Sequence, residues 1–338
     1  MLRMRNVLVA AGVLALGLTA CTSTATPSTT PAATGASQTA AKDPLTKGDG
    51  TKTIYLVSKG FQHRFWQAVK EGAEQGGKEF GYKVEFVGPA NEKAVNEQLG
   101  QLETALASNP AAIGFAALDS AAAGPVLNKI KAANIPVIAF DSGVESDIPL
   151  TTVQTNNTAA AAEAAKHLAE LVGKKGKVAL VCHDNTSQTG KQRCEGFKEY
   201  MKTNAPDITV LPEVIAGEVG EAANAAKNTL QANPDVVGIY GTNEAAAIGA
   251  LQGVTEAGKA SSIKIVGFDS GKAQIDAIKA GTEAGAVTQS PVKMGYETVK
   301  AAVMAINGAK LDKVIDSGFA WYDKTNIDSD AIKPNLYE

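Results

Sequence analysis

Cysteine, histidine and aromatic residues are scarce in this sequence. Its 338 residues include three cysteines and three histidines, and aromatic residues make up 5%. Three cysteines are too few for the disulfide framework that holds small secreted domains together, and three histidines leave little material for a histidine-rich metal site. No run of 18 apolar residues occurs, so no membrane-spanning helix is predicted. The net charge of −3 argues against a nucleic-acid-binding protein with a broad basic face.

The residues that are abundant are typical of an α/β protein. Hydrophobic residues make up 44% and charged residues 20%, the balance of a globular chain with a sizeable core. Glycine occurs 33 times, and alanine is concentrated in runs that favour helices. At about 150 residues per domain, the length predicts roughly two domains.

The N-terminus has the pattern of an export signal. Two arginines (Arg3 and Arg5) precede an apolar stretch over residues 7–18, so residues 1–20 are predicted to be a signal peptide. The sequence Leu-Thr-Ala-Cys that ends at Cys21 resembles a bacterial lipobox, which implies lipidation of Cys21; the alternative is an ordinary signal peptide with a chance cysteine. Residues 21–50 are rich in Thr, Ser, Ala, Pro and Gly and are predicted to be a disordered tether. The expected location is therefore extracytoplasmic, on the outer face of the cell membrane (the periplasmic side if an outer membrane exists).

From residue 53 onward, apolar β-rich runs alternate with segments of helical spacing. The predicted strands cover residues 53–58, 83–87, 112–117, 136–140, 177–182, 209–215, 236–240, 263–268 and 284–288. The predicted helices cover residues 65–80, 93–107, 121–133, 158–171, 190–203, 220–231, 243–256, 273–280 and 292–306. Such alternation predicts parallel sheets with helices on both faces, here as two Rossmann-like, doubly wound lobes. Ligands bind at the carboxyl ends of such strands.

Polar residues follow the predicted strands at those ends. Asp141 and Asp269 come after matching apolar runs, and each carboxylate could accept hydrogen bonds from two hydroxyl groups of a ligand. Helix capping is the competing interpretation for both aspartates, and equally for Asn243. Arg193 could be a solvated surface charge, and Gln289, just before a proline, could be a turn residue.

Two aromatic residues stand at the start of the first predicted helix. Phe65 and Trp66 could pack against the C–H face of a ring-shaped ligand, or could belong to the core. Cys182 and Cys194 could form a disulfide or remain two buried thiols. Searches for HExxH and GxSxG motifs find none, so we predict no catalytic residue, no cofactor and no metal.

Four segments in order carry a family resemblance: residues 134–141, 241–249, 266–269 and 287–291. With them, the chain from about residue 53 to 319 resembles the type I periplasmic sugar-binding proteins of the ribose and galactose type, which serve ABC importers. The resemblance implies two lobes joined by a three-strand hinge, with crossings near residues 154–156, 288–290 and 317–319. The N-terminal lobe would comprise residues 51–155 plus 290–317, and the C-terminal lobe residues 156–289 plus 318–338.

The resemblance also implies a ligand site between the lobes. The residues that match the family's sugar-binding positions are Phe65, Trp66, Asp141, Arg193, Asn243, Asp269 and Gln289. The chain departs from the family at three further candidate positions. His63 stands where ribose-type proteins have Asn, Ser142 where a basic residue is usual, and Glu218 near the place of a second-lobe aromatic. These departures point to a ligand other than ribose.

The implied function is capture of a monosaccharide-like ligand (a pentose, hexose or polyol) and its delivery to an ABC importer permease with its ATPase. The protein is expected to be a monomer and no enzyme, attached to the membrane by its lipid anchor. One alternative is a sensor or receptor for a furanose-like signal molecule. Another is an exported α/β enzyme, for which the sequence offers no nucleophile–base pair.

Overall fold

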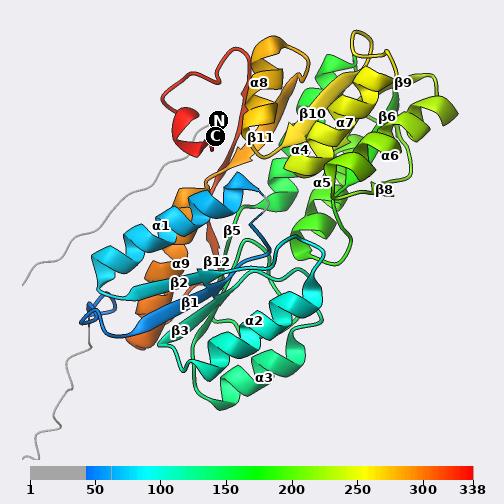
Figure 1. The fold of residues 1–338 in the computed structure, drawn as a ribbon. Helices are drawn as coiled ribbons and strands as arrows, with labels where there is room; N and C mark the ends of the chain where they lie inside the picture. Colours follow the sequence, from blue (N-terminus) through cyan, green and yellow to red (C-terminus); the bar gives the residue numbers. More distant parts are fainter. Residues whose placement is uncertain (1–42, 62, 338) are drawn as a thin grey trace, which may run out of the picture. The chain divides into compact units, whose positions relative to one another are not determined.

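Two β-sheets, each covered by helices on both faces, organise the described part of the chain (Figure 1). The computed structural model describes residues 43–61 and 63–337. The predicted signal peptide, Cys21 and most of the predicted tether lie outside these residues. Within them, no helix combines the length and apolar character needed to cross a membrane.

The first sheet has six strands in the order β12-β5-β4-β3-β1-β2, and all neighbours pair in parallel. The strands are β1 (Thr53–Val57), β2 (Lys83–Val87), β3 (Ala112–Phe115), β4 (Val137–Phe140), β5 (Thr152–Gln154) and β12 (Val314–Asp316). Its helices are α1 (Arg64–Phe80), α2 (Val95–Ala107), α3 (Gly124–Ala132) and α9 (Pro291–Ile306). We call these elements the first lobe; in Figure 1, α1 and α9 lie on one face of its sheet and α2 and α3 on the other.

The second sheet has the order β13-β11-β10-β9-β6-β7, with β8 also paired to β6. The strands are β6 (Gly176–Cys182), β7 (Ile208–Val210), β8 (Val214–Ile215), β9 (Val236–Gly241), β10 (Lys264–Phe268), β11 (Gly285–Gln289) and β13 (Phe319–Asp323). Its helices are α4 (Asn157–Leu171), α5 (Gln188–Asn204), α6 (Val219–Ala232), α7 (Glu244–Glu256) and α8 (Lys272–Ala280). These elements are the second lobe, and together the two sheets confirm the predicted doubly wound α/β fold.

The strand predictions differ from the structure in four places. The expected strand over residues 209–215 is two short strands, β7 and β8, because Pro212 interrupts it and proline cannot donate to a sheet ladder. The short strands β5 and β12 and the last strand, β13, were not predicted, and β13 runs antiparallel to β11. The strict alternation of strand and helix is therefore interrupted where β5 follows β4, where β8 follows β7 and where β13 follows β12.

The chain passes between the lobes three times, and the three crossings touch one another. They lie between β5 and α4, between β11 and α9, and between β12 and β13. The Thr155 hydroxyl on the first crossing donates to Gln289 Oε1 on the second at 2.9 Å, and it lies 3.4 Å from Ser317 Oγ on the third. Small hydroxyl and amide groups thus join the crossings into one hinge.

Glycine permits a close helix–helix contact in the first lobe. Helices α1 and α9 pack directly together. A Cβ atom at Gly72 would meet the backbone carbonyl of Val292, and one at Gly295 would meet the carbonyl of Val69. Because backbone atoms cannot move aside as a flexible side chain can, both positions require glycine. This packing fixes the start of α1, where Phe65 and Trp66 lie.

The last residues of the chain contact both lobes. The 3-10 helix η1 (Lys333–Asn335) brings Tyr337 to the hinge. The Tyr337 hydroxyl accepts a hydrogen bond from the Ser270 backbone N–H of the second lobe at 3.1 Å, and its ring packs edge-on against Phe65 of the first lobe. Residues 318–338, predicted for the second lobe, therefore end in contact with the first lobe as well.

Candidate functional site: a polar cavity between the lobes

A small cavity lies where the carboxyl ends of the two sets of strands face each other. Its lining side chains are Lys59, His63, Phe65, Trp66, Glu92 and Asp141 from the first lobe and His183, Thr189, Arg193, Asn243, Asp269 and Gln289 from the second. We call this space the central cavity. It contains about 20 Å³, room for roughly one water molecule. A ring-shaped ligand therefore needs the lobes to stand further apart than they do here, both to enter the space and to be held in it.

Contacts between the lobes close the central cavity. Lys59 Nζ donates to Thr189 Oγ1 across it at 3.2 Å. The Thr186 hydroxyl of the second lobe donates to the Leu118 carbonyl of the first at 3.0 Å. Because these bonds join polar groups that water can also satisfy, opening the lobes exchanges them for hydration at small net cost.

Phe65 and Trp66 form an aromatic wall on the first-lobe side. Their ring centroids lie 4.9 Å apart with nearly perpendicular planes, and Trp66 also contacts Phe140 edge-on. The Trp66 indole N–H donates to Glu92 Oε1 at 2.8 Å, which fixes the orientation of its ring. Both rings are almost fully buried in the core, and both also line the central cavity.

Asp141 follows β4 in a left-handed backbone conformation, with φ of 55°. Asp and Asn tolerate this region better than most residues, and non-glycine residues in it cluster at functional sites. Burial raises the pKa of the Asp141 carboxyl to about 6, although the charges of Lys59 and Arg193 oppose the shift. Among the described residues, no hydrogen bond from the protein to this carboxylate is found, and no helix follows directly for it to cap. Its oxygens can accept hydroxyl groups of a ligand.

Asp269 follows β10 in the same unusual conformation, with φ of 79°. Gln289 Nε2 donates to its Oδ1 at 2.8 Å, and the Glu244 backbone N–H donates to its Oδ2 at 3.1 Å. Asp269 therefore does cap a helix, but the helix is α7 rather than the one that follows it. Both polar groups of the Gln289 amide are hydrogen-bonded, because its Oε1 also accepts from the Thr155 hydroxyl. Gln289 therefore holds Asp269 in place.

Arg193 is buried beneath the second-lobe side of the central cavity. Its Nε donates to Asn157 Oδ1 at 2.8 Å and its Nη1 donates to the Thr242 carbonyl at 3.0 Å. The guanidinium carbon lies 3.7 Å from the centre of the Phe268 ring, and Nη1 lies 3.9 Å from Asp269 Oδ2. These contacts rule out a solvated surface charge and fix a cation next to the Asp269 carboxylate.

Asn243 caps a helix and also lines the central cavity. Its Oδ1 accepts from the Ala246 N–H at 2.8 Å and so caps α7. The same side chain lines the central cavity. Because the cap uses the oxygen, the amide nitrogen is the group available to a ligand.

Four lining residues were not among the predicted site residues: Lys59, Glu92, His183 and Thr189. The carboxylates of Glu92, Asp141 and Asp184 raise the pKa of Lys59 even though burial alone lowers it, so the residue is a buried cation. Burial lowers the pKa of His183 to about 4, which keeps its imidazole neutral. The rule that polar groups after strands form the site could have found Glu92 and His183, which follow β2 and β6. The same rule could have found Lys59, which comes two residues after β1.

The three predicted positions where the chain departs from the family lie in different places. His63 lines the central cavity. Ser142 is buried but not part of the lining, and its hydroxyl has no hydrogen-bond partner. Glu218 lies at the start of α6 and lines a neighbouring cavity instead. Among the described residues, no cluster of three potential metal ligands occurs.

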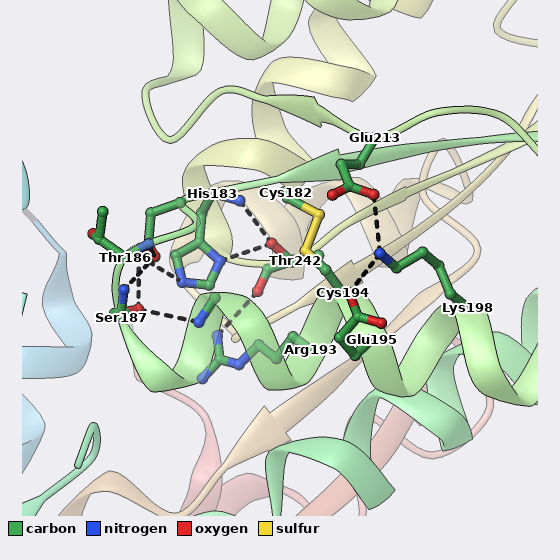
Figure 2. Close-up of a disulfide and its surroundings, with 12 residues drawn as sticks. Cys182, His183, Thr186, Ser187, Arg193, Cys194, Glu195, Lys198, Glu213 and Thr242 are labelled. Atoms are coloured by element: carbon green, nitrogen blue, oxygen red, sulfur yellow. Dashed lines mark hydrogen bonds and ion pairs between the residues drawn. A yellow bond between two sulfur atoms is a disulfide. The ribbon is translucent and has the colours of Figure 1, made fainter. Parts of the chain in front are cut away.

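A disulfide joins the end of β6 to α5, between Cys182 and Cys194 (Figure 2). It encloses the loop that carries His183, whose Nδ1 lies 2.7 Å from Thr242 Oγ1. Arg193 precedes Cys194 on α5, and Figure 2 shows it directed to the Thr242 carbonyl. The crosslink therefore ties two lining residues to the edge of the second sheet.

Comparisons with known proteins agree with this architecture. A family described as periplasmic binding protein domain matches residues 54–310. The ribose import binding protein RbsB of Bacillus subtilis is 26% identical over 265 residues, which cover 78% of this chain and 85% of that protein. The D-allose-binding periplasmic protein of Escherichia coli is also 26% identical, over 76% of this chain and 85% of its own length.

Solved structures give the same result. The solute-binding protein of an ABC transporter from Agrobacterium vitis, with bound D-fucose, shares 32% identity and a TM-score of 0.80, covering 84% of this chain and all of that one. A carbohydrate transporter solute-binding protein from Agrobacterium radiobacter, in complex with D-arabinose, shares 30% identity and a TM-score of 0.81, covering 84% and 98%. These relatives are transport proteins and not enzymes, as predicted for this chain. The chain belongs to the periplasmic binding protein family, with the type I arrangement of two parallel-sheet lobes.

Proposed function

We propose that this protein captures a neutral monosaccharide or polyol between its two lobes and delivers it to an ABC importer permease with its ATPase. The observation that carries the proposal is the central cavity, in which the aromatic wall and the Asp141 carboxylate of the first lobe face a carboxylate, an amide and a guanidinium of the second lobe. Hydroxyl groups both donate and accept, so a sugar can satisfy Asp141 and Asp269 as a donor and Arg193 and Asn243 as an acceptor.

The charges around the central cavity favour an uncharged ligand. The buried cations Lys59 and Arg193 lie among the carboxylates of Glu92, Asp141 and Asp269, so charges of opposite sign largely balance. An added carboxylate or phosphate on the ligand would have no unmatched cation to pair with, and a buried unpaired charge is costly. The sugars bound by the relatives from Agrobacterium, D-fucose and D-arabinose, are neutral.

Ligand binding would favour the closed arrangement of the lobes. A sugar in the central cavity contacts both lobes only when they are closed, so it has a higher affinity for that state and shifts the population toward it. The hinge of Thr155, Gln289 and Ser317 joins the crossings between the lobes, and Gln289 also holds Asp269. A permease would then distinguish loaded from empty protein by the closed surface.

The cellular place of the protein is part of the proposal. A lipid on Cys21 would hold the two lobes on the outer face of the cell membrane, beside the permease. Metabolic labelling with a clickable palmitate, with Cys21→Ala as control, tests this directly. Label on the wild type alone supports the anchor, and equal label on both proteins contradicts it.

A thermal-shift screen tests the ligand class. The full-length protein in detergent is heated with pentoses, hexoses, polyols and inositols. A ligand at 100 times its Kd stabilises by about 2.7 kcal/mol and raises Tm by several degrees. A shift with at least one neutral sugar or polyol is expected, and the absence of any shift across the panel would contradict the proposal.

A further inference from the structure

A second, larger cavity adjoins the central cavity. Both are lined by Glu92, His183 and Asn243, so the two spaces meet at these side chains. The second space contains about 520 Å³, within the roughly 300–1,000 Å³ of small-molecule sites. We call it the side cavity. Its further walls come from the loop after β6, from β8 and from the start of α6.

One wall of the side cavity is apolar. Val214 on β8 lines it and is 37% exposed, one of the five large hydrophobic side chains that are exposed among the described residues. Ala225 on α6 continues this wall. Exposed apolar side chains that adjoin one another in a concave site lose contact with water when a ligand covers them.

The other walls are polar and mainly acidic. Glu92, Asp184, Glu218 and Glu221 contribute carboxylates, against the single cation of Lys93. Lys93 of the first lobe forms an ion pair with Glu221 of the second, and both side chains are about half exposed. An exposed ion pair of this kind contributes roughly 0–1 kcal/mol. A ligand group that enters between the lobes can therefore displace it at little cost.

We propose that the side cavity is a subsite for a second unit attached to the sugar, so that a neutral glycoside or disaccharide binds more tightly than the free monosaccharide. The inference rests on the proposed function, because the first sugar unit occupies the central cavity. The second unit packs its apolar face on Val214 and Ala225. Its hydroxyl groups donate to the carboxylates that line the same space, and these carboxylates disfavour an anionic unit such as a uronic acid.

Calorimetric titration of the full-length protein in detergent tests this subsite. The probes are D-glucose, D-galactose and D-fucose, each compared with its p-nitrophenyl β-glycoside, together with cellobiose and lactose. At least one of the extended probes is expected to bind about tenfold or more tightly than its parent sugar. If a parent sugar binds and every extended probe binds more weakly than its parent, the subsite is refuted while the proposed function stands.

A cavity-filling variant separates the two spaces. Ala225→Trp places a large side chain in the side cavity, and Ala232→Trp on the exposed end of the same helix is the matched control. Ala225→Trp is expected to weaken the extended probe at least tenfold and to leave the parent sugar within twofold, with no change for Ala232→Trp. Equal weakening of both probes, or of neither, would overturn the subsite. If none of these probes binds the wild type while the thermal-shift screen finds another neutral sugar or polyol, the subsite is refuted and the proposed function stands.

Discussion

Asp141 and Asp269 occupy matching places in the two lobes, yet the protein holds them differently. Each follows a phenylalanine at the end of a strand, has a positive φ, and donates its backbone N–H to the neighbouring strand, to Val153 or Val287. Asp269 is then held by Gln289, by the Glu244 backbone N–H and by Arg193. Asp141 depends on the nearby charges of Lys59 and Arg193.

The difference shows that the second lobe carries the fixed half of the central cavity. Its carboxylate and guanidinium are oriented by hydrogen bonds within that lobe, so their geometry does not depend on closure. The first-lobe carboxylate has a counter-ion, Arg193, on the other lobe. When the lobes open, Asp141 loses that charge and gains water in exchange, so its environment is the one that changes most on binding.

Substitution of Arg193 should have the largest effect on affinity and stability, because this residue holds the second-lobe side of the central cavity together. Arg193→Ala leaves Asp269 without its cation, so we expect affinity for the sugar found in the thermal-shift screen to fall by at least about 100-fold. The free energy of unfolding should fall by about 3 kcal/mol, because the variant leaves a buried charge uncompensated. Calorimetric titration and urea unfolding measure the two losses.

Arg193→Lys is the matched control for charge. Lysine keeps a cation but cannot donate to Asn157 and Thr242 in the same planar geometry, so an intermediate affinity is expected. Wild-type affinity in Arg193→Ala would show that the second lobe does not hold the ligand in this way.

The disulfide is a stabilising feature of the second-lobe half. The double variant Cys182→Ser and Cys194→Ser removes the crosslink between two residues that lie 12 positions apart in the sequence. By the chain-entropy account, closure of a loop of this length contributes about 3 kcal/mol to the free energy of unfolding. Urea unfolding of the wild type with and without reductant, beside the double variant, measures this contribution. Reductant should destabilise the wild type alone, and equal sensitivity of the two proteins would contradict it.

Asp141 should have the opposite effect on stability: its buried carboxylate lowers the free energy of unfolding, although it contributes to sugar binding. Burial raises the folded-state pKa of Asp141 to about 6, above the ordinary value of 3.8. The folded state therefore favours the protonated form, and the stability that this residue contributes is lost as the pH rises from about 4 to 6. Asp141→Asn should accordingly raise the free energy of unfolding by about 3 kcal/mol at pH 8 and change it little at pH 4, while it weakens sugar binding.

Asp269→Asn tests the second-lobe carboxylate in the same way. The wild-type carboxylate of Asp269 accepts hydrogen bonds and lies beside Arg193, so its replacement by an amide should lower the free energy of unfolding at pH 8. Urea unfolding of both variants at the two pH values gives the test. Stabilisation by both amides, or by neither, would contradict the distinction between the two aspartates.

Substitution of Tyr337 should have the smallest effect on affinity, because this residue contacts both lobes but does not line the central cavity. Tyr337→Phe keeps the ring against Phe65 and removes the acceptor of the Ser270 N–H. An affinity about fivefold weaker is expected, which corresponds to about 1 kcal/mol for one hydrogen bond. Tyr322→Phe, which removes a hydrogen bond to the Asp269 carbonyl within the second lobe, is the control for a purely local loss.

The sequence was sufficient for the fold and for most of the lining. Alternation of strands and helices predicted both sheets, and the rule of polar residues after strands predicted Asp141, Asn243 and Asp269. Lys59 was not predicted as a site residue, because only the three-dimensional placement of Glu92 and Asp141 around it shows that it is a buried cation. The contact of Tyr337 with Phe65 joins residues 272 positions apart in the sequence, and no local pattern signals it.

The central claim is that one sugar is held by both lobes at once. Titration calorimetry with the sugar from the thermal-shift screen, on the wild type, Asp141→Ala and Asp269→Ala, tests it most directly. We predict that each variant loses at least about tenfold in affinity, since each removes one lobe's carboxylate from a shared ligand. Wild-type affinity in either variant would mean that a single lobe holds the ligand, and would contradict the account.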